Sequence, residues 1–445
     1  MTPQTTTLTR RRLLAAVPLS TLLAACGGGG IGSDDTDTPT IQEFALAEPA
    51  LVGAPASLRV RFSGGNARIE PGLGTVSSGQ LVQTPVLGST QRYRLIVSKP
   101  GVGETTRELV VAPAWRNRLR SFDAAPMAGH AVAAAADGSA LVLGGSRGEG
   151  VLSSAIDRFD PATQRFTRLG QMATGRSEMS AVPLGDGRVL VFGGSTSSVQ
   201  PPFAEIVDTR TGAASAGGWM VLPRSRHAAL RLADGRVAAV GGTQRNSIEL
   251  WSPADNTWAP AGNRMVHTRE HATASLLPDG RVLIVGGSTP ATNYAFAEVF
   301  DPANESFTTV ADAPAERRWL HAALTLPDGS VLVVGGENEA GALASIWRFD
   351  VAAQRFVAQA PLTAARSVVS AVVTPDSELL LYGGEQQPDE GVNSGVAWRA
   401  GSQRALPEMS APRAWHSLTR LSDGRLLVLG GQHRSSLVGG GMLYD

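Results

Sequence analysis

Apolar runs and glycine pairs alternate in a regular order through residues 114–445, and residues 271–307 show the unit most clearly. A short apolar run is followed by an Asp279-Gly280 turn, the run Val282–Val285, a glycine pair, a polar loop and another apolar run. Asp-Gly between two apolar runs is a strong hairpin signal, because both turn residues need positive φ. The run 282–285 does not alternate with polar residues, so both of its faces must be covered. Each unit therefore predicts one small antiparallel sheet with a neighbour on either side.

The unit occurs seven times. Paired glycines follow an apolar run in every copy, at 144–145, 193–194, 241–242, 286–287, 335–336, 383–384 and 430–431. The pairs lie 45 to 49 residues apart, and a four-stranded unit of this period is typical of kelch repeats, which are arranged radially. Residues 114–445 therefore resemble kelch repeat proteins, and the resemblance implies an all-β fold with a seven-bladed kelch β-propeller. A six-bladed ring would require one well-formed copy to be discarded.

The two ends of this region complement each other. The last copy stops at residues 442–445, where the other copies have the end of their third strand, as at Phe300-Asp301. Its fourth strand is missing, and an apolar stretch within residues 115–122 precedes the first copy. We expect residues 115–122 to supply that strand and to close the ring, because closure removes two exposed sheet edges.

Residues 1–25 predict an export signal rather than a folded element. Three arginines at 10–12 precede the apolar stretch Leu13–Ala25, which is too short to span a bilayer. Residues 23–26, Leu-Ala-Ala-Cys, resemble a bacterial lipobox, and this resemblance implies that Cys26 becomes the lipidated first residue of the exported protein. The alternative is that Cys26 is an ordinary residue near a cleavage site.

The export route and the final location follow from neighbouring residues. Thr9–Leu14 resembles a twin-arginine signal, so the general and the twin-arginine routes both remain open. Residue 27 is Gly rather than Asp, which by analogy with the known sorting rule favours the outer membrane. The expected location is extracytoplasmic, with a lipid anchor in the periplasm or outer membrane of a Gram-negative bacterium. Residues 26–40 are rich in glycine and aspartate and predict a lipidated tether.

Residues 41–113 predict a second, smaller β unit. Apolar residues at 58, 60 and 62 alternate with Arg59 and Arg61, as in a strand with one exposed face. About seven short strands in this length favour a β-sandwich, and the region resembles the immunoglobulin-like modules of bacterial surface proteins. It contains no cysteine, so no disulfide stabilises it. Two roles are open for this unit, a spacer and a binding module.

The charge balance limits the possible partners. Lysine and arginine together number 39, as do aspartate and glutamate, so there is no electrostatic case for binding nucleic acid. Lys99 is the only lysine, so arginine carries nearly all of the positive charge, and guanidinium groups bind carboxylates with two hydrogen bonds.

Arginine and histidine recur where the first strand of each unit begins. In a propeller blade these positions lie on the same face as the glycine pairs, at the rim of the central channel. The spacing Arg-x-x-His is complete at Arg224 and His227, Arg318 and His321, and Arg413 and His416; His130 and His271 hold the histidine place alone, and Arg176 and Arg366 the arginine place alone. His433, in the loop after the last glycine pair, is expected on the same face.

Two interpretations of this pattern remain open. The arginines and histidines can tie neighbouring loops together, as is common in such repeats. Alternatively, they form a positively charged funnel for an anionic ligand, such as an acidic sugar or a carboxylate-rich segment. The ligand-binding set of this second hypothesis consists of Arg176, Arg224, His227, His271, Arg318, Trp319, His321, Glu337, Arg366, Glu385, Arg413, Trp415, His416 and His433.

An enzymatic alternative starts from galactose-oxidase-type kelch rings, which carry copper on this face. That family uses two histidines, two tyrosines and a cysteine cross-linked to one tyrosine. Residues 413–416, Arg-Ala-Trp-His, resemble its Arg-x-Tyr-His segment, but Trp415 stands where the ligand tyrosine would be. The chain has four tyrosines, and its only cysteine is Cys26, so the radical copper cofactor cannot be assembled. No cofactor, metal ligand or catalytic residue is assigned.

These observations favour a membrane-anchored, extracytoplasmic binding module that recognises a carbohydrate or a protein ligand on the Arg/His face. The alternative function is a kelch-type enzyme that acts on sugars, either an isomerase or mutarotase or a metal-dependent enzyme. An acid and a base that converge in the channel would favour the enzyme, whereas arginines already paired with neighbouring loops would favour a scaffold.

Overall fold

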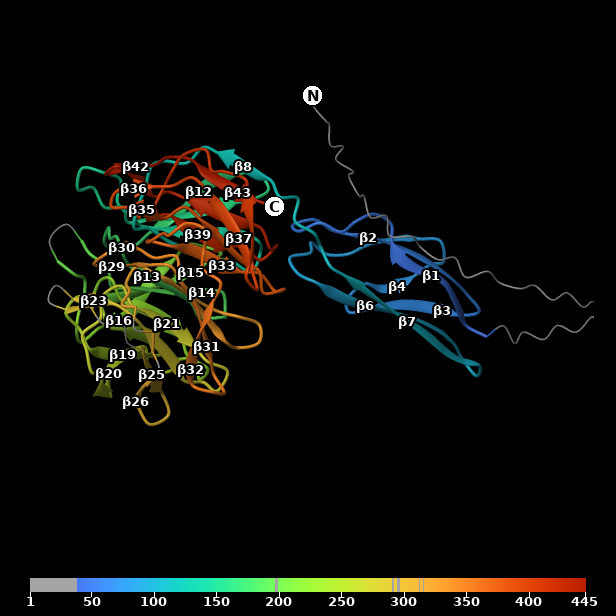
Figure 1. The fold of residues 1–445 in the computed structure, drawn as a ribbon. Helices are drawn as coiled ribbons and strands as arrows, with labels where there is room; N and C mark the ends of the chain where they lie inside the picture. Colours follow the sequence, from blue (N-terminus) through green and yellow to red (C-terminus); the bar gives the residue numbers. More distant parts are fainter. Residues whose placement is uncertain (1–37, 197–198, 290–291, 294–296, 312, 315) are drawn as a thin grey trace, which may run out of the picture.

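The computed structural model describes residues 38–445, except 197–198, 290–291, 294–296, 312 and 315. Every regular element in the described residues is a β-strand. The strands form two bodies, a small two-sheet unit and a larger ring of sheets (Figure 1). The predicted export signal, Cys26 and most of the predicted tether lie outside the described residues. The described part of the chain contains no helix with the length and hydropathy needed to span a membrane.

The small unit is a β-sandwich. One sheet contains β1 (Thr40–Leu46), β2 (Ser57–Ser63) and β5 (Leu81–Gln83). The other contains β3 (Asn66–Glu70), β4 (Gly74–Val76), β6 (Gln91–Lys99) and β7 (Gly103–Val111). Leu58 and Val60 of β2 pack with Leu95 and Val97 of β6 in one core, as the alternating pattern predicts. The likeness of this unit to immunoglobulin modules stays a prediction.

Seven four-stranded antiparallel sheets, here called blades 1 to 7, make up the rest of the described chain. Their strands, from the first to the fourth in each blade, are β9 (Ala131–Ala134), β10 (Ala140–Leu143), β11 (Ala155–Asp160) and β12 (Arg165–Gln171); β13 (Ser180–Pro183), β14 (Arg188–Phe192), β15 (Phe203–Asp208) and β16 (Ala214–Trp219); β17 (Ala228–Arg231), β18 (Val237–Val240), β19 (Ser247–Ser252) and β20 (Thr257–Arg264); β21 (Thr273–Leu276), β22 (Val282–Val285), β25 (Ala297–Asp301) and β26 (Ser306–Thr309); β27 (Ala322–Thr325), β28 (Val331–Val334), β31 (Ile346–Asp350) and β32 (Arg355–Gln359); β33 (Ser370–Val373), β34 (Leu379–Tyr382), β37 (Gly395–Arg399) and β38 (Ser402–Leu406); and β39 (Ser417–Arg420), β40 (Leu426–Leu429), β43 (Gly441–Tyr444) and β8 (Leu119–Phe122).

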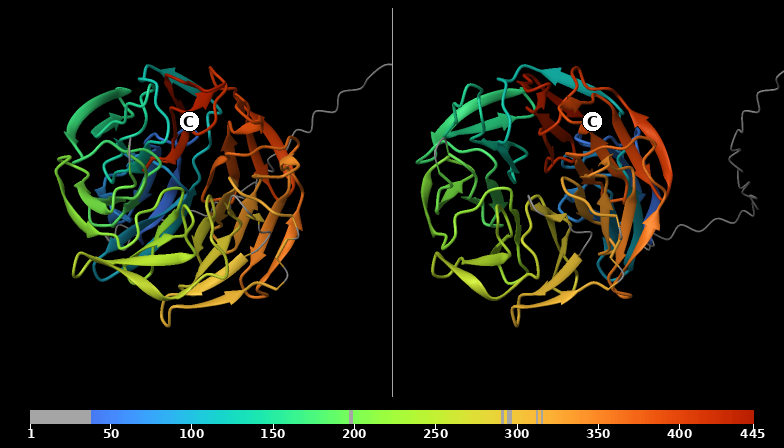
Figure 2. Two further views of the ribbon diagram at one scale, coloured as in Figure 1. Left: turned by 90° about the vertical axis from the view of Figure 1, so that its left-hand side faces the viewer. Right: turned by 60° about the vertical axis from the view of Figure 1, so that its left-hand side comes forward.

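The first strands of the blades form a closed circle. Each first strand contacts the first strand of the next blade, and β39 of blade 7 contacts β9 of blade 1. Figure 2 shows the blades arranged around this central axis. The second strands, such as β22, are buried along their length except at Arg188, the first residue of β14, because the core clusters lie between successive blades. Val282 and Ile284 of β22, for example, pack against Ala238 and Val240 of β18. This packing explains why the second apolar run of each unit does not alternate with polar residues.

The ring closes between the two ends of the predicted propeller region. Strand β8 is antiparallel to β43, with Leu119 opposite Tyr444 and Phe122 opposite Gly441. The carboxylate of Asp445 is buried and accepts hydrogen bonds from Arg116, Arg118 and Arg120 at 3.1, 3.2 and 2.5 Å. The predicted closing segment 115–122 is therefore a strand from residue 119, while residues 116 and 118 hold the chain end through their side chains.

Four short hairpins follow glycine pairs and extend from the ring on the face with the glycine pairs: β23 (Ser288–Thr289) with β24 (Thr292–Asn293), β29 (Glu337–Asn338) with β30 (Gly341–Ala342), β35 (Glu385–Gln387) with β36 (Glu390–Gly391), and β41 (Gln432–His433) with β42 (Ser436–Leu437).

The sandwich contacts the face of the ring opposite these hairpins. Arg420 Nη2 donates to the carbonyl oxygen of Gly88 at 2.6 Å, and Gly88 packs on the Asp423-Gly424 turn of blade 7. The face with the glycine pairs and hairpins is thus left open.

Candidate functional site

A buried arginine holds each of blades 2 to 7 together. It lies four residues before the first strand, and its Nη1 donates to the carbonyl oxygen of the first glycine in the pair of the same blade. The Nη1–O distances are 2.5 to 3.5 Å, and each residue is at most 2% exposed. The six residues are Arg176, Arg224, Arg269, Arg318, Arg366 and Arg413.

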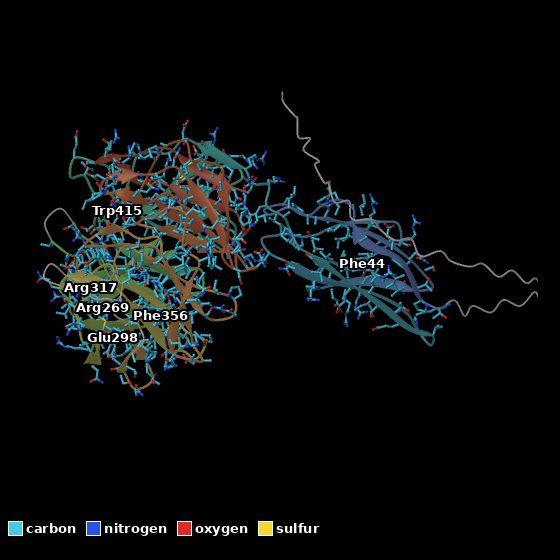
Figure 3. All side chains as sticks on the ribbon, viewed as in Figure 1. Phe44, Arg269, Glu298, Arg317, Phe356 and Trp415 are labelled. Atoms are coloured by element: carbon cyan, nitrogen blue, oxygen red, sulfur yellow. The ribbon has the colours of Figure 1, made fainter. Side chains whose placement is uncertain are left out.

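Four of these guanidinium groups also bind a carboxylate. The pairs are Arg176–Glu205 at 2.9 Å, Arg224–Glu249 at 2.6 Å, Arg269–Glu298 at 2.9 Å and Arg318–Glu316 at 2.6 Å, and Figure 3 labels Arg269 and Glu298. Arg366 and Arg413 bind carbonyl and hydroxyl oxygens instead. Burial lowers the pKa of Arg413 to about 10.

The structure therefore corrects the hypothesis of a positively charged funnel. The arginines proposed to bind an anionic ligand, which are Arg176, Arg224, Arg318, Arg366 and Arg413, are interior residues. Their Nη groups bind oxygens within the ring of blades, so they present no charge to a ligand at the rim. Arg269 is the equivalent buried arginine of blade 4. It is missing from the ligand-binding set predicted from the sequence, because that prediction places His271 at the histidine position of the Arg-x-x-His pattern.

Four histidines link adjacent blades. His130, His227, His321 and His416 each lie directly before a first strand, and the imidazole packs on the first glycine of the pair in the preceding blade. A Cβ added at Gly193, for example, would lie 2.4 Å from Cε1 of His227. These glycines also have positive φ, so the position requires glycine for two reasons.

The linking histidines are neutral. Burial lowers the pKa of His227, His321 and His416 to about 3 and that of His130 to about 4. His130 Nε2 hydrogen-bonds with the Ser417 hydroxyl at 2.9 Å, and His321 Nε2 with the Thr273 hydroxyl at 2.8 Å. The hypothesis that His227, His321 and His416 contact a ligand is therefore replaced by a framework role, because their rings are enclosed between blades.

The residue between the arginine and the histidine positions has an unusual backbone. Two residues after each framework arginine, and at the equivalent place in blade 1, φ is 51° to 63°. We call this set the mouth ring: Gly129, Glu178, Arg226, His271, Leu320, Val368 and Trp415. A left-handed conformation costs an L-residue roughly 1–2 kcal/mol, and such strain is concentrated at functional sites. His271 belongs to this ring, and Ala272 takes the linking-histidine place in blade 4.

A cavity of about 480 Å³ opens at the mouth ring. Five ring residues line it, together with polar and acidic residues of the surrounding loops. The rings of His271 from blade 4 and Trp415 from blade 7 meet edge to face at 5.9 Å, so the two sides of the ring come together here. The lining residues are Gly129, Glu178, Arg226, His271 and Trp415 from the ring, and Ala128, Ser146, Ser177, Glu385, Pro388, Asp389, Gln432 and Leu437.

Most of the charged side chains that line this cavity are acidic. Arg226 Nε lies 3.5 Å from Glu178, and its Nη1 lies 3.5 Å from Glu270, so its charge is shared between two carboxylates. Burial lowers the pKa of His271 to about 4, with a further contribution from Arg226, so the imidazole is neutral.

Glu385 is the most buried carboxyl group of the cavity, with 7% of the residue exposed. Its burial raises its pKa, and the negative charges of Glu337 and Asp389 add to this effect. Hydrogen bonds from the backbone N–H of Asp389 and from the Trp415 side chain offset it only in part. A buried carboxyl group with a raised pKa is either protonated or, when it is ionised, stabilised by a nearby cation.

Of the sequence-based ligand set, the structure brings His271, Glu385 and Trp415 together in the cavity. Trp319 and Glu337 bind each other through Trp319 Nε1 and Glu337 Oε1 at 2.8 Å and do not line it. His433 is half-buried in β41, next to the lining residue Gln432. Sequence reasoning missed Glu178, Arg226, Asp389 and Gln432. The position before each linking histidine identifies Arg226, and the equivalent position before Met179 in blade 2 identifies Glu178.

Comparisons with known proteins show the fold. No family model matches the chain, and no curated protein matches it in sequence. Among solved structures, it is similar to one described as a novel fungal alcohol oxidase with catalytic diversity among the AA5 family, in complex with copper. The TM-score is 0.61 at 17% identity, over 75% of this chain and 76% of that chain. The chain has an all-β, galactose-oxidase-like propeller fold. At this identity the likeness shows nothing beyond the fold.

A copper centre like that of the similar oxidase does not fit the described residues of this chain, and Tyr294 lies outside them. Tyr382 and Tyr444 are fully buried inside blades 6 and 7, where their rings lie 6.0 Å apart, and Tyr93 is in the sandwich core. Among the described residues, no three His, Cys, Asp or Glu side chains are grouped so that they could hold a metal ion. The mouth position nearest the expected ligand tyrosine is Trp415, which offers an indole ring and no metal ligand.

Proposed function

We propose that this chain is an exported, lipid-anchored binding module whose propeller binds a carbohydrate at the mouth ring. The observation that carries the proposal is the cavity of about 480 Å³, which combines an indole ring with several hydrogen-bonding side chains. Its size lies within the range of small-ligand sites. A sugar presents a C–H face and a rim of hydroxyl groups, so Trp415 is placed to pack on the face while Glu178, Glu385 and Gln432 accept or donate at the rim.

The framework beneath the cavity supports a binding role. A buried arginine precedes six of the seven mouth-ring residues and a linking histidine follows four of them, so Arg226, Leu320 and Trp415 are held from both sides. A rigid site loses less conformational freedom when its ligand binds, and this preorganisation strengthens affinity. A protein ligand is the alternative partner, and it would have to place a narrow segment into the same cavity.

The anchor is part of the same proposal. Lipidation at Cys26 would hold the sandwich and propeller at a membrane, and the sandwich contacts the face opposite the cavity, so the cavity stays accessible. In cells fed with a labelled fatty acid, we expect the label on the protein and in the membrane fraction. Cys26→Ser is expected to lose both, and an unlabelled protein that stays in the membrane would rule out the acyl anchor.

A glycan array followed by calorimetric titration tests carbohydrate binding. Trp415→Ala is expected to weaken binding by at least about 30-fold, which corresponds to about 2 kcal/mol for a central aromatic contact. Trp219→Ala is the matched control, because Trp219 is 69% exposed on the outer strand of blade 2, away from the cavity. Equal losses for both variants, or a protein that binds no glycan but captures a peptide or protein, would overturn the carbohydrate site.

A second candidate function is catalysis on a sugar, either isomerisation or hydrolysis. It is favoured by Glu385, whose raised pKa suits a proton donor, and by a second carboxyl group, that of Glu178, in the same cavity. If it is correct, sugar turnover followed by NMR should disappear in Glu385→Gln while binding persists. If wild-type protein binds a glycan and leaves its anomers and linkages unchanged, the enzymatic function is excluded for that glycan.

A further inference from the structure

The cavity carries more negative than positive charge, and this imbalance bears on the ligand. Three carboxyl groups line it, those of Glu178, Glu385 and Asp389, against one guanidinium group, that of Arg226. The formal charge of the lining is therefore −2, from three negative groups and one positive group. His271 adds no charge because its imidazole is neutral.

Arg226, the only cationic side chain among the described lining residues, already forms ion pairs. Arg226 lies 3.5 Å from both Glu178 and Glu270, at the edge of the cavity. Glu385 and Asp389 form no ion pair with any described residue; Glu385 is bound by neutral N–H groups, and Asp389 accepts a hydrogen bond from the Ser435 hydroxyl at 2.6 Å. Two carboxyl groups next to an indole ring thus lack a counterion.

We infer that the mouth cavity selects a carbohydrate that carries a free, protonated amino group. This inference rests on the proposed carbohydrate-binding function and names its ligand class. A primary ammonium group has three N–H donors, which suit the free acceptor positions of Glu385 and Asp389. The face of Trp415 attracts the cation through its ring quadrupole and also packs on the C–H face of the sugar. An anionic sugar would bring its carboxylate against three others.

A neutral acetamido group and a quaternary ammonium group fit this cavity less well than a primary ammonium group. An acetamido group carries no charge, so it leaves Glu385 and Asp389 uncompensated. A quaternary ammonium group has no N–H to donate, and its recognition depends on cages of several aromatic rings. Here the described lining contains one indole and one imidazole, and the remaining residues are polar or small and aliphatic, so no cage of several aromatic rings is present.

A matched series of trisaccharides tests the inference. The three probes are β-1,4-linked and differ only at C2, where they carry an amino, an acetamido or a hydroxyl group. In calorimetric titrations of the exported form at about pH 6, where amines are protonated, the amino sugar is expected to bind about 10- to 100-fold more tightly than the other two. Equal or weaker binding of the amino sugar would overturn the inference and leave the carbohydrate site intact. Binding of no sugar in this series or on the array would overturn the proposed function as well.

Charge-removing variants localise the effect. Glu385→Gln and Asp389→Asn are each expected to reduce the preference for the amino sugar by about 10-fold or more, with little change in binding of the hydroxyl analogue. Glu390→Gln is the control, since Glu390 is adjacent in sequence, half-exposed, and outside the cavity lining. If the control lowers the preference as much as Asp389→Asn, the selectivity comes from the general charge of the face and the specific site is rejected.

The pH dependence gives a second readout. Glu385 is surrounded by Glu337, Asp389 and Trp415, and the cavity also holds Glu178, Arg226 and His271. Binding of the ammonium group requires the ionised carboxylate, so amino-sugar affinity is expected to fall as the pH drops from about 6 to about 4. The decrease should be smaller in Glu385→Gln. A wild-type affinity that is constant over this range, or that rises on acidification, would contradict the role of Glu385.

Discussion

Arg413 and Trp415 are two residues apart, but they have opposite roles. Arg413 is fully buried and binds the carbonyl oxygens of Gly430 and Gly440. Trp415 has φ of 56° and lines the cavity. A single left-handed residue turns the chain, so an interior position and a ligand-facing position alternate within one short segment. In blades 2 to 6 a buried framework arginine likewise stands two residues before a left-handed mouth-ring residue, so we expect the framework to determine stability and the mouth ring to determine ligand binding.

This comparison explains how one fold can change its ligand. Framework residues depend on one another, because each arginine needs its glycine carbonyl and each linking histidine needs its glycine. Mouth-ring residues share a backbone conformation and differ in chemistry, from Gly129 to Val368 and Trp415. Substitutions of framework residues should therefore mainly lower the free energy of unfolding, whereas substitutions in the mouth ring should mainly change ligand binding.

The largest expected effect is the loss of a framework arginine. Arg224→Ala leaves the fully buried carboxylate of Glu249 without its partner, which is expected to lower the free energy of unfolding by about 3–5 kcal/mol. Arg226→Ala, two residues on, removes a half-exposed side chain and is expected to change it by about 0–1 kcal/mol. Denaturant unfolding measures both variants. Similar values for the two would remove the distinction between framework and mouth.

Ring closure is the next largest effect. Asp445→Asn removes the negative charge that three arginines bind, and we expect a decrease of about 1.5–3 kcal/mol in the free energy of unfolding. Asp279→Asn is a control at an exposed turn of blade 4, where the aspartate binds its neighbour Arg281. Equal stability of Asp445→Asn and wild type in urea would mean that the β8–β43 pairing alone closes the ring.

The linking histidines predict a pH dependence. Their pKa is lowered from 6.5 to about 3 or 4 in the folded protein, so the unfolded chain binds more protons below pH 6.5. Stability is therefore expected to fall as the pH drops from 6.5 towards 3, by about 1.4 kcal/mol per pH unit for each histidine. His416→Gln should reduce this slope by about one proton. An unaltered slope in His416→Gln would show that its ring is protonated in the fold.

The smallest expected effect concerns backbone strain in the mouth ring. Arg226→Gly is expected to be more stable than Arg226→Ala by about 1 kcal/mol, because glycine adopts positive φ without the Cβ clash. The usual order of these residues in regular structure is the reverse. Melting temperatures of the two variants measure the difference. A more stable alanine variant would show that the turn is not strained.

Most of the fold could be predicted from the sequence, because its determinants are local and repeated. The glycine pairs, the Asp-Gly turns and the second strands without polar alternation predict seven sheets. The last copy has no fourth strand after its third-strand end at residues 442–445, and this pointed to the segment 115–122. Each signal reflects a requirement of one residue, such as the positive φ of Gly193, and does not depend on distant partners.

The candidate cavity lies at the rim that the Arg-x-x-His pattern marks, but the arginines of that pattern are interior residues. Burial of Arg224 depends on Glu249, which lies 25 residues later on β19. No periodic signal links the two residues in the sequence. His271 was aligned by residue type, although it lies one place before the linking position. Asp389 and Gln432 come from hairpins that differ between blades, so only the assembled ring brings them to the cavity.

The most direct test compares Trp415→Ala and Arg413→Ala by glycan titration and thermal melting in parallel. We predict that Trp415→Ala melts within a few degrees of wild type and loses binding, whereas Arg413→Ala melts at a clearly lower temperature and, while still folded, loses much less affinity than Trp415→Ala. The opposite result, an Arg413→Ala protein with normal melting and no binding beside a Trp415→Ala protein that binds normally, would contradict the division between framework and mouth ring.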